Sequence, residues 1–224
     1  MSIGFDPRKR VFSLKTRHTA YQMIVDHYQT LLHVYYGPKI DDAADYIIQR
    51  IERSFAPSPG DAELMDSTFS LDVLPQEFPT RGTGDFRINA FQLIDGDGAM
   101  SCDLRYVSHQ VIPGKYSLSG LPAVYAPEDK EETLIISLED SRTKIQVELF
   151  YGVLPERDVI TRAVKIINGG IETVTLEKVS SACLDFLYGN FDLIHFSGRH
   201  EGERNFKRGP PMNGTRSFGS RRGV

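Results

Sequence analysis

The sequence contains no tryptophan and only two cysteines among its 224 residues. Without an indole ring, only tyrosine or phenylalanine could stack on a flat ligand. Cys102 and Cys183 are far apart in apolar contexts, which favours buried free thiols, although one disulfide between them stays open. No apolar run approaches the roughly 18–20 residues of a membrane span, and the N-terminus lacks a secretory pattern. We therefore expect a cytoplasmic protein without a membrane partner.

Motifs for common catalytic chemistry are also missing. The sequence has no nucleophile elbow, phosphate-binding glycine loop, CxxC pair or His-x-x-x-His helix. Its six histidines are scattered, and no pair has metal-ligand spacing. We therefore predict no metal and no cofactor. A net charge of −4 gives no general attraction for nucleic acid, and the basic segment near the C-terminus is short, so we predict no nucleic-acid partner either.

Alternation of apolar and polar residues dominates what is present. Phe12 and Leu14 fall on one face of a predicted strand, and Ile145, Val147 and Leu149 do so on another. Glycine or proline follows most such runs, which predicts many short antiparallel strands. The turn residues Asp95–Gly98 predict a hairpin that joins strands at 91–94 and 104–107. One short helix is predicted from Asp41 or Asp42 through Ile51.

Two stretches do not alternate. Residues 52–87 are too long for an idle connection, and residues 199–224 are rich in glycine and arginine. The first stretch holds several acids, and two facing acids are what a glycosidase needs. We favour the alternative that they cap backbone amides or pair with nearby arginines. The acids considered are Asp66, Asp72, Glu77 and Asp85, and the arginines are Arg81 and Arg87.

Short motifs across most of the chain resemble one known family. Leu74–Pro79 (LPQEFP) and Gly82–Arg87 (GTGDFR) are similar to a stretch of the family 36 glycoside hydrolases, the bacterial α-galactosidases. Each match alone is weak, but the whole set in the same order is specific. The further matches are Leu32–Gly37, Phe69–Asp72, Asp103–His109, Leu118–Ala123, Asp158–Arg162, and Ser197–Gly198 with Glu203–Arg204.

The resemblance implies the fold and the domain organisation. Family members have an N-terminal β-supersandwich, a catalytic (β/α)₈ barrel and a small C-terminal β domain. We expect an all-β, antiparallel β-supersandwich over residues 1–198, with one or two short helices and a long loop at about 52–87. Residues 199–224 would lead toward a barrel that this chain does not contain. The family's two catalytic aspartates lie on that barrel, so we predict no catalytic residue here.

The resemblance also implies a function for the parent protein. Its members hydrolyse terminal α-linked galactose from oligosaccharides of the raffinose and melibiose type, with a retaining mechanism. The N-terminal domain is expected to support a homo-oligomer, a tetramer in the full-length parent, and to shape the active site formed with a neighbouring catalytic barrel. Glu52, Asp66 and Ser67 are the predicted galactoside-binding residues, with the alternative that Glu52 and Asp66 only pin the loop. At Ser67 relatives often carry arginine, and at His200 they tend to carry tryptophan.

Two other kinds of protein stay open. One is a free-standing carbohydrate-binding β-sandwich, which requires exposed tyrosine or phenylalanine rings in the absence of tryptophan. The other is a protein similar to galactose epimerases, which requires a paired acid and histidine in a concave sheet. No motif in the sequence indicates such a pair.

Overall fold

The computed structural model describes residues 2–50, 66, 68–121, 124, 130–186, 189–211 and 214–219. The chain forms two compact units, Met1–Asp185 and Phe186–Val224. The boundary predicted after residue 198 lies inside the second unit, between two paired strands. That residues 199–224 lead toward a barrel stays a prediction.

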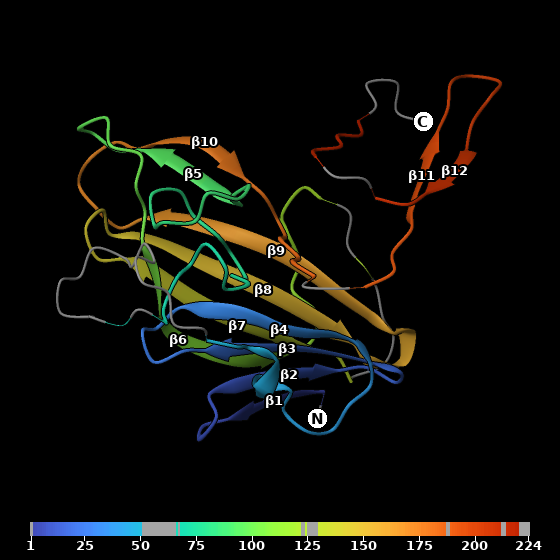
Figure 1. Ribbon diagram of the computed structural model, residues 1–224, viewed down its shortest axis with the longest axis horizontal. Helices are drawn as coiled ribbons and strands as arrows, with labels where there is room; N and C mark the ends of the chain where they lie inside the picture. Colours follow the sequence, from blue (N-terminus) through green and yellow to red (C-terminus); the bar gives the residue numbers. More distant parts are fainter. Residues whose placement is uncertain are drawn as a thin grey trace. The chain divides into compact units, whose positions relative to one another are not determined.

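The first sheet of the larger unit is an antiparallel meander of four strands (Figure 1). These strands are β1 (Ile3–Asp6), β2 (Val11–Lys15), β3 (Thr19–Val25) and β4 (Leu31–Pro38). The register sets Phe12 opposite Met23 and Leu14 opposite Tyr21, so the apolar side chains of β2 and β3 form rows on one face. All four side chains are buried, which confirms the alternation predicted for Phe12 and Leu14.

The second sheet is also a four-stranded antiparallel meander. Its strands are β6 (Leu104–Pro113), β7 (Glu132–Asp140), β8 (Ile145–Leu154) and β9 (Val159–Asn168). Ile145, Val147 and Leu149 on β8 are buried on one face, as predicted. The 3₁₀ turn η2 (Pro155–Arg157) connects β8 to β9 and ends at Asp158, which has the left-handed φ of 53°.

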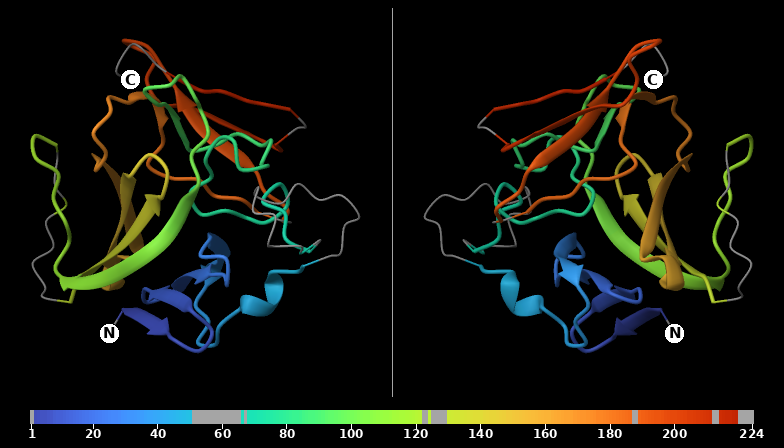
Figure 2. Two further views of the ribbon diagram at one scale, coloured as in Figure 1. Left: turned by 90° about the vertical axis from the view of Figure 1, so that its left-hand side faces the viewer. Right: turned by 90° about the vertical axis from the view of Figure 1, so that its right-hand side faces the viewer.

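The two sheets contribute to one hydrophobic core. Phe12 and Met23 from the first sheet belong to the same buried cluster as Leu134 and Leu149 from the second sheet. Figure 2 shows the two sheets of the larger unit from the side. Packing of two antiparallel sheets over a shared apolar layer is the sandwich arrangement. The predicted all-β class is confirmed.

The hairpin predicted around Asp95–Gly98 is wrong in its pairing. The turn forms, with Gly98 at a φ of 82°, but the strands on either side of it enter different sheets. β5 (Phe91–Ile94) pairs with the distant β10 (Thr175–Val179), and β6 pairs with β7. Arg142 from the β7–β8 turn binds the carboxylate of Asp95 and so ties the turn to the second sheet.

The helix predicted from Asp41 or Asp42 through Ile51 is also wrong over the described residues. Only the 3₁₀ turn η1 (Asp45–Ile47) forms, and Ile48 is extended. Gln22 on β3 explains the difference, because its side-chain amide accepts from Ala44 N–H at 2.9 Å and donates to the carbonyl oxygen of Asp42 at 2.9 Å. These bonds hold the chain against the sheet at the position where a helix would have to begin.

The described part of the long loop, residues 68–87, is well packed although it forms no strand or helix. Phe69, Leu71 and Leu74 are buried together with Leu32 of β4 in a second hydrophobic cluster. Isolated bridges pair Gln76 with Leu32 and Thr80 with Phe91. The loop is therefore part of the folded body of the larger unit.

The described part of the smaller unit contains one antiparallel strand pair, β11 (Leu193–Ser197) and β12 (Asn205–Gly209). Phe196 faces Phe206 across this pair, with ring centroids 5.7 Å apart. Both cysteines of the chain are free, as favoured from the sequence. Among the described residues, no helix is long and apolar enough to cross a membrane.

Candidate functional site

Of the three predicted galactoside-binding residues, the structure describes Asp66; Glu52 and Ser67 lie outside the described residues. The carboxylate of Asp66 accepts three hydrogen bonds. Thr68 donates from its hydroxyl at 2.6 Å and from its backbone N–H at 2.9 Å, and Tyr28 donates from its hydroxyl at 2.8 Å. These donors, led by the Thr68 hydroxyl, lower the pKa of Asp66 to about 2, so the side chain is a carboxylate at neutral pH.

Arg50 holds Asp66 on its other side. Its guanidinium donates to the carboxylate of Asp26 at 2.9 Å and lies 3.6 Å from that of Asp66. The same guanidinium lies over the rings of Tyr28 and Phe69, 5.7 and 5.5 Å from their centroids. We call Arg50, Asp26, Asp66 and Tyr28 the Arg50 cluster. It joins the end of β3 to both described ends of the segment between residues 50 and 66.

Asp26 anchors the Arg50 cluster to the backbone. Its side chain is buried, and its Oδ1 accepts the backbone N–H groups of Tyr28 and Thr30, both at 2.9 Å. These two backbone groups bind Oδ1 and leave Oδ2 of Asp26 for Arg50. Arg50 and Asp26 could not be predicted from the sequence, since neither lies in a motif shared with the family.

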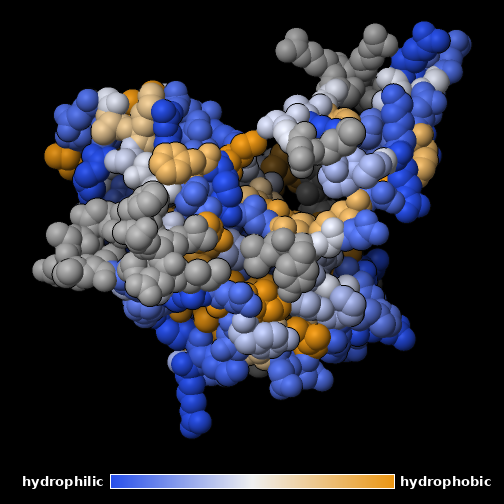
Figure 3. All heavy atoms as spheres, in the orientation of Figure 1, coloured by the Kyte–Doolittle hydropathy of each residue, from blue (hydrophilic) through white to orange (hydrophobic). Residues whose placement is uncertain are grey.

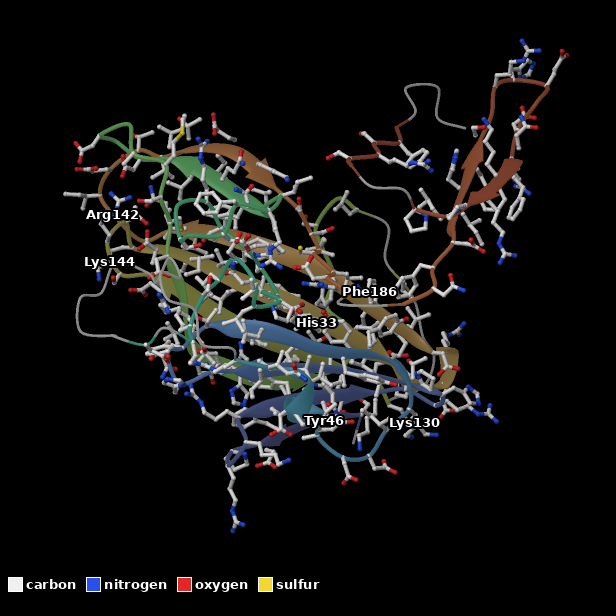
Figure 4. All side chains as sticks on the ribbon, viewed as in Figure 1. His33, Tyr46, Lys130, Arg142, Lys144 and Phe186 are labelled. Atoms are coloured by element: carbon white, nitrogen blue, oxygen red, sulfur yellow. The ribbon has the colours of Figure 1, made fainter. Side chains whose placement is uncertain are left out.

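A second polar cluster lies deeper, around Glu77. Its fully buried carboxylate lies 2.7 Å from the guanidinium of Arg162 on β9 and accepts hydrogen bonds from the hydroxyls of Tyr21 on β3 and Tyr151 on β8. His33 of β4, visible in the interior in Figure 4, lies 3.5 Å from it. We call these five residues the Glu77 cluster. It joins the long loop to both sheets.

Charge compensation explains how Glu77 is tolerated in the interior. Burial alone would raise the pKa of Glu77, but Arg162, His33 and Tyr21 outweigh burial, and the pKa is lowered. Burial, followed by the charge of Glu77, raises the pKa of both tyrosines, so their hydroxyls remain donors. The Glu77 cluster therefore places a permanent ion pair where the sheets and the loop meet.

The motif Gly82–Arg87 folds around one arginine. Arg87 donates to the carboxylates of Asp85 and Asp185 and to the carbonyl oxygens of Leu71 and Leu74, at 2.8–3.0 Å. The pairing of Asp85 with Arg87 is the role favoured for this acid from the sequence. Gly82 has a φ of 86°, and a Cβ there would lie 2.5 Å from the Cβ of Ser101, so glycine is required.

The carboxyl groups of the described residues form structural contacts. Each of them whose pKa departs from its ordinary value departs downward, among them Asp66, Glu77 and Asp85. A glycosidase general acid needs the opposite, a raised pKa. No group of three or more His, Cys, Asp or Glu in the described part of the chain could hold a metal ion. This arrangement can fix the position of loops and charges.

The motifs noted in the sequence meet in space. Glu77 lies in Leu74–Pro79, Arg162 in Asp158–Arg162 and His33 in Leu32–Gly37, and all three belong to the Glu77 cluster. The motifs are visible in the sequence but this contact is not, because a single sequence does not show which distant charged residues pair.

The fold and these clusters define a supporting β domain, built to hold a loop against a sandwich. Comparison with known proteins gives the family. Residues 29–224 match the glycosyl hydrolase family 36 N-terminal domain, and the chain belongs to this family.

Its relatives are α-galactosidases of greater length. The chain is 48% identical over 224 residues to the bifunctional alpha-galactosidase/sucrose kinase AgaSK of Mediterraneibacter gnavus, and the matched region is 100% of this chain but 24% of that protein. It is 36% identical over 226 residues to the alpha-galactosidase AgaA of Geobacillus stearothermophilus, at 100% and 31% coverage. The chain thus spans less than a third of either relative.

Solved structures have the same fold. The galactosidase domain of AgaSK aligns with a TM-score of 0.92 at 48% identity, over 98% of this chain and 30% of that one. AgaB of Geobacillus stearothermophilus aligns with a TM-score of 0.91 at 36% identity, over 99% and 30%. A variant of AgaA in complex with raffinose aligns with a TM-score of 0.87 at 36% identity, over 95% and 29%.

Proposed function

We propose that this chain is the non-catalytic N-terminal part of a retaining α-galactosidase that removes terminal α-linked galactose from oligosaccharides of the raffinose and melibiose type. The match to α-galactosidases along the full chain carries the proposal. The lowered pKa of the carboxyl groups at Asp66, Glu77 and Asp85 supports the non-catalytic role. The acids that cleave the sugar bond would lie elsewhere in the parent. The proposed location is the cytoplasm.

The domain would support a homo-oligomer, a tetramer in the parent, and shape the active site of a neighbouring barrel. Glu52, Asp66 and Ser67 are the residues proposed to contact the galactoside. Asp66 is a fixed carboxylate, and a carboxylate has about four lone-pair positions, of which three accept protein donors. One position is left for a sugar hydroxyl. The alternative, that Asp66 only pins the loop, draws on the same three bonds.

Hydrolysis of p-nitrophenyl α-galactoside tests the non-catalytic role. The 224-residue chain should give no turnover above background, while the parent at equal molar concentration is active. Turnover by the chain alone that a single acid-to-amide substitution abolishes would refute the proposal.

Substitution in the parent tests the contact residues. Asp66→Ala combined with Glu52→Ala should raise KM for raffinose by roughly tenfold or more, because two hydrogen bonds to sugar hydroxyls are lost. A lowered melting temperature with an unchanged KM would show that these residues pin the loop. Ser67→Ala gives a second, independent measurement of KM.

A carbohydrate-binding module is the second candidate. It draws support from exposed aromatic rings, since Tyr46 and Phe86 are 79% and 83% exposed. Polar residues cover most of the face seen in Figure 3, and apolar residues reach the surface there in separate spots. Calorimetric titration of the chain with raffinose separates the two functions. Binding that Tyr46→Ala or Phe86→Ala removes would favour the module, and no binding would favour the enzyme domain.

A further inference from the structure

Arg50 connects a buried carboxylate to the proposed sugar-binding carboxylate. Its Nη2 donates to Asp26 at 2.9 Å, and its Nη1 lies 3.6 Å from Asp66. The Nη1 atom is buried and has no hydrogen-bond partner among the residues that the structure describes. A buried nitrogen atom is not accessible to a sugar, so the side of the guanidinium that faces Asp66 can act on a ligand only through that carboxylate.

Arg50 fixes the position of Asp66 in two ways, by direct contact and through Tyr28. Tyr28 donates to the carboxylate of Asp66 and also lies under the guanidinium of Arg50. Phe69 lies under the same guanidinium and packs against Tyr28, with ring centroids 4.4 Å apart. Arg50 therefore holds Asp66 through its charge and holds the hydroxyl donor of Asp66 through stacking.

We propose that Arg50 is a positioning residue that fixes the carboxylate of Asp66 for galactoside binding. The proposal rests on the proposed sugar contact of Asp66. Lysine could keep one ion pair, but its single ammonium group lacks the planar fork that reaches both carboxylates and stacks on both rings. A side chain without charge would leave the buried carboxylate of Asp26 without its partner.

A double-mutant cycle in the full-length parent tests the proposal. Arg50→Met should raise KM for raffinose by roughly fivefold with kcat within about twofold, and Arg50→Lys should recover part of this loss. Since Arg50 acts through Asp66, Arg50→Met should not raise KM further in the Asp66→Asn background. Arg157→Met, a change of an exposed arginine on η2, is the matched control and should leave KM unchanged.

Two outcomes would overturn the role of Arg50. One is a rise in KM on Arg50→Met that is as large in the Asp66→Asn background as it is with Asp66 intact. The other is an unchanged KM on Arg50→Met while Asp66→Asn raises it. An unchanged KM on Asp66→Asn would instead reject the proposed sugar contact.

Amide hydrogen exchange separates the two proposals, because it needs no substrate. The backbone N–H of Thr68 donates to Asp66, so its exchange reports whether the carboxylate stays in place. Arg50→Met should speed the exchange of Thr68 by roughly tenfold, and Arg157→Met should not. Unchanged protection of Thr68 in Arg50→Met would overturn the positioning role whatever the kinetics of the parent.

Discussion

Glu77→Gln should destabilise this protein far more than the loss of an ordinary ion pair. The substitution keeps the shape of the side chain and removes its charge. The guanidinium of Arg162, only 11% exposed, then loses its carboxylate, and the hydroxyls of Tyr21 and Tyr151 share one amide oxygen. Removing one partner of a buried pair costs about 3–5 kcal/mol of unfolding free energy. We expect a loss in that range.

A double-mutant cycle isolates the pair. Arg162→Met should cost about as much as Glu77→Gln, because it leaves Glu77 charged and buried. The combined variant leaves neither charge unpaired. Its cost should therefore fall short of the sum of the single costs by about 2–3 kcal/mol.

Urea unfolding followed by far-ultraviolet circular dichroism measures these free energies, since no tryptophan is present for fluorescence. Glu148→Gln is the matched control. It breaks the ion pair of Glu148 with Lys165 on the neighbouring strand, whose side chains are 25% and 59% exposed, and should cost less than about 1 kcal/mol. A loss below about 1 kcal/mol for Glu77→Gln, or additive single effects, would refute the reasoning.

The pH dependence of Glu77 follows from its lowered pKa. The ordinary value is 4.5 and the folded value is lower, so the stability that Glu77 contributes is fully present above the unfolded pKa. It is lost as pH falls through the folded pKa. The gap in unfolding free energy between the protein and Glu77→Gln should therefore be constant near neutral pH and shrink below about pH 4.5.

Three other predictions concern single residues. Gly82→Ala should lower the unfolding free energy by at least about 1–3 kcal/mol in the same urea assay, because its positive φ and close contact both oppose a Cβ. Burial raises the pKa of Cys102 strongly and that of Cys183 to about 11. Both thiols should therefore react slowly with Ellman's reagent at about pH 8, and Cys102 should be the slower of the two. Fast reaction of Cys102 would contradict its burial. Hydrogen bonds from His18 and Thr16 lower the pKa of Asp158 to about 2, so its carboxyl carbon should titrate in nuclear magnetic resonance near that pH, and a midpoint near the ordinary value of 3.8 would show that these bonds are absent.

Alternation predicted the strands well because each sheet buries one face. Phe12, Leu14 and Val147 are buried where the pattern placed them. Periodicity does not specify which strands pair, and β5 pairs with β10 although its turn residues indicated a local hairpin. The helix at residues 41–51 failed for a related reason. The side chain of Gln22 on β3 takes the carbonyl oxygen of Asp42, which a helix that begins there would use, and it ties Ala44 to the sheet.

The candidate site was predicted in part. Asp66 was chosen by its place before a shared motif, and its neighbours Arg50 and Asp26 gave no signal, because their contacts depend on the fold. Glu77 and Arg162 each lie in a recognised motif. Their contact could not be predicted from one sequence, because neither motif indicates which distant residue its charged side chain contacts.

The Glu77 cluster also bears on how the chain acquires its fold during synthesis. Tyr151 and Glu77 are 74 positions apart, and Arg162 comes later still. While the ribosome has released only the first sheet and the loop, the carboxylate has no guanidinium to meet it and stays hydrated. The ion pair that fixes the loop can form only after β9 has emerged. A nascent chain arrested before Arg162 should therefore be cut by proteases along residues 68–87 more readily than the finished chain.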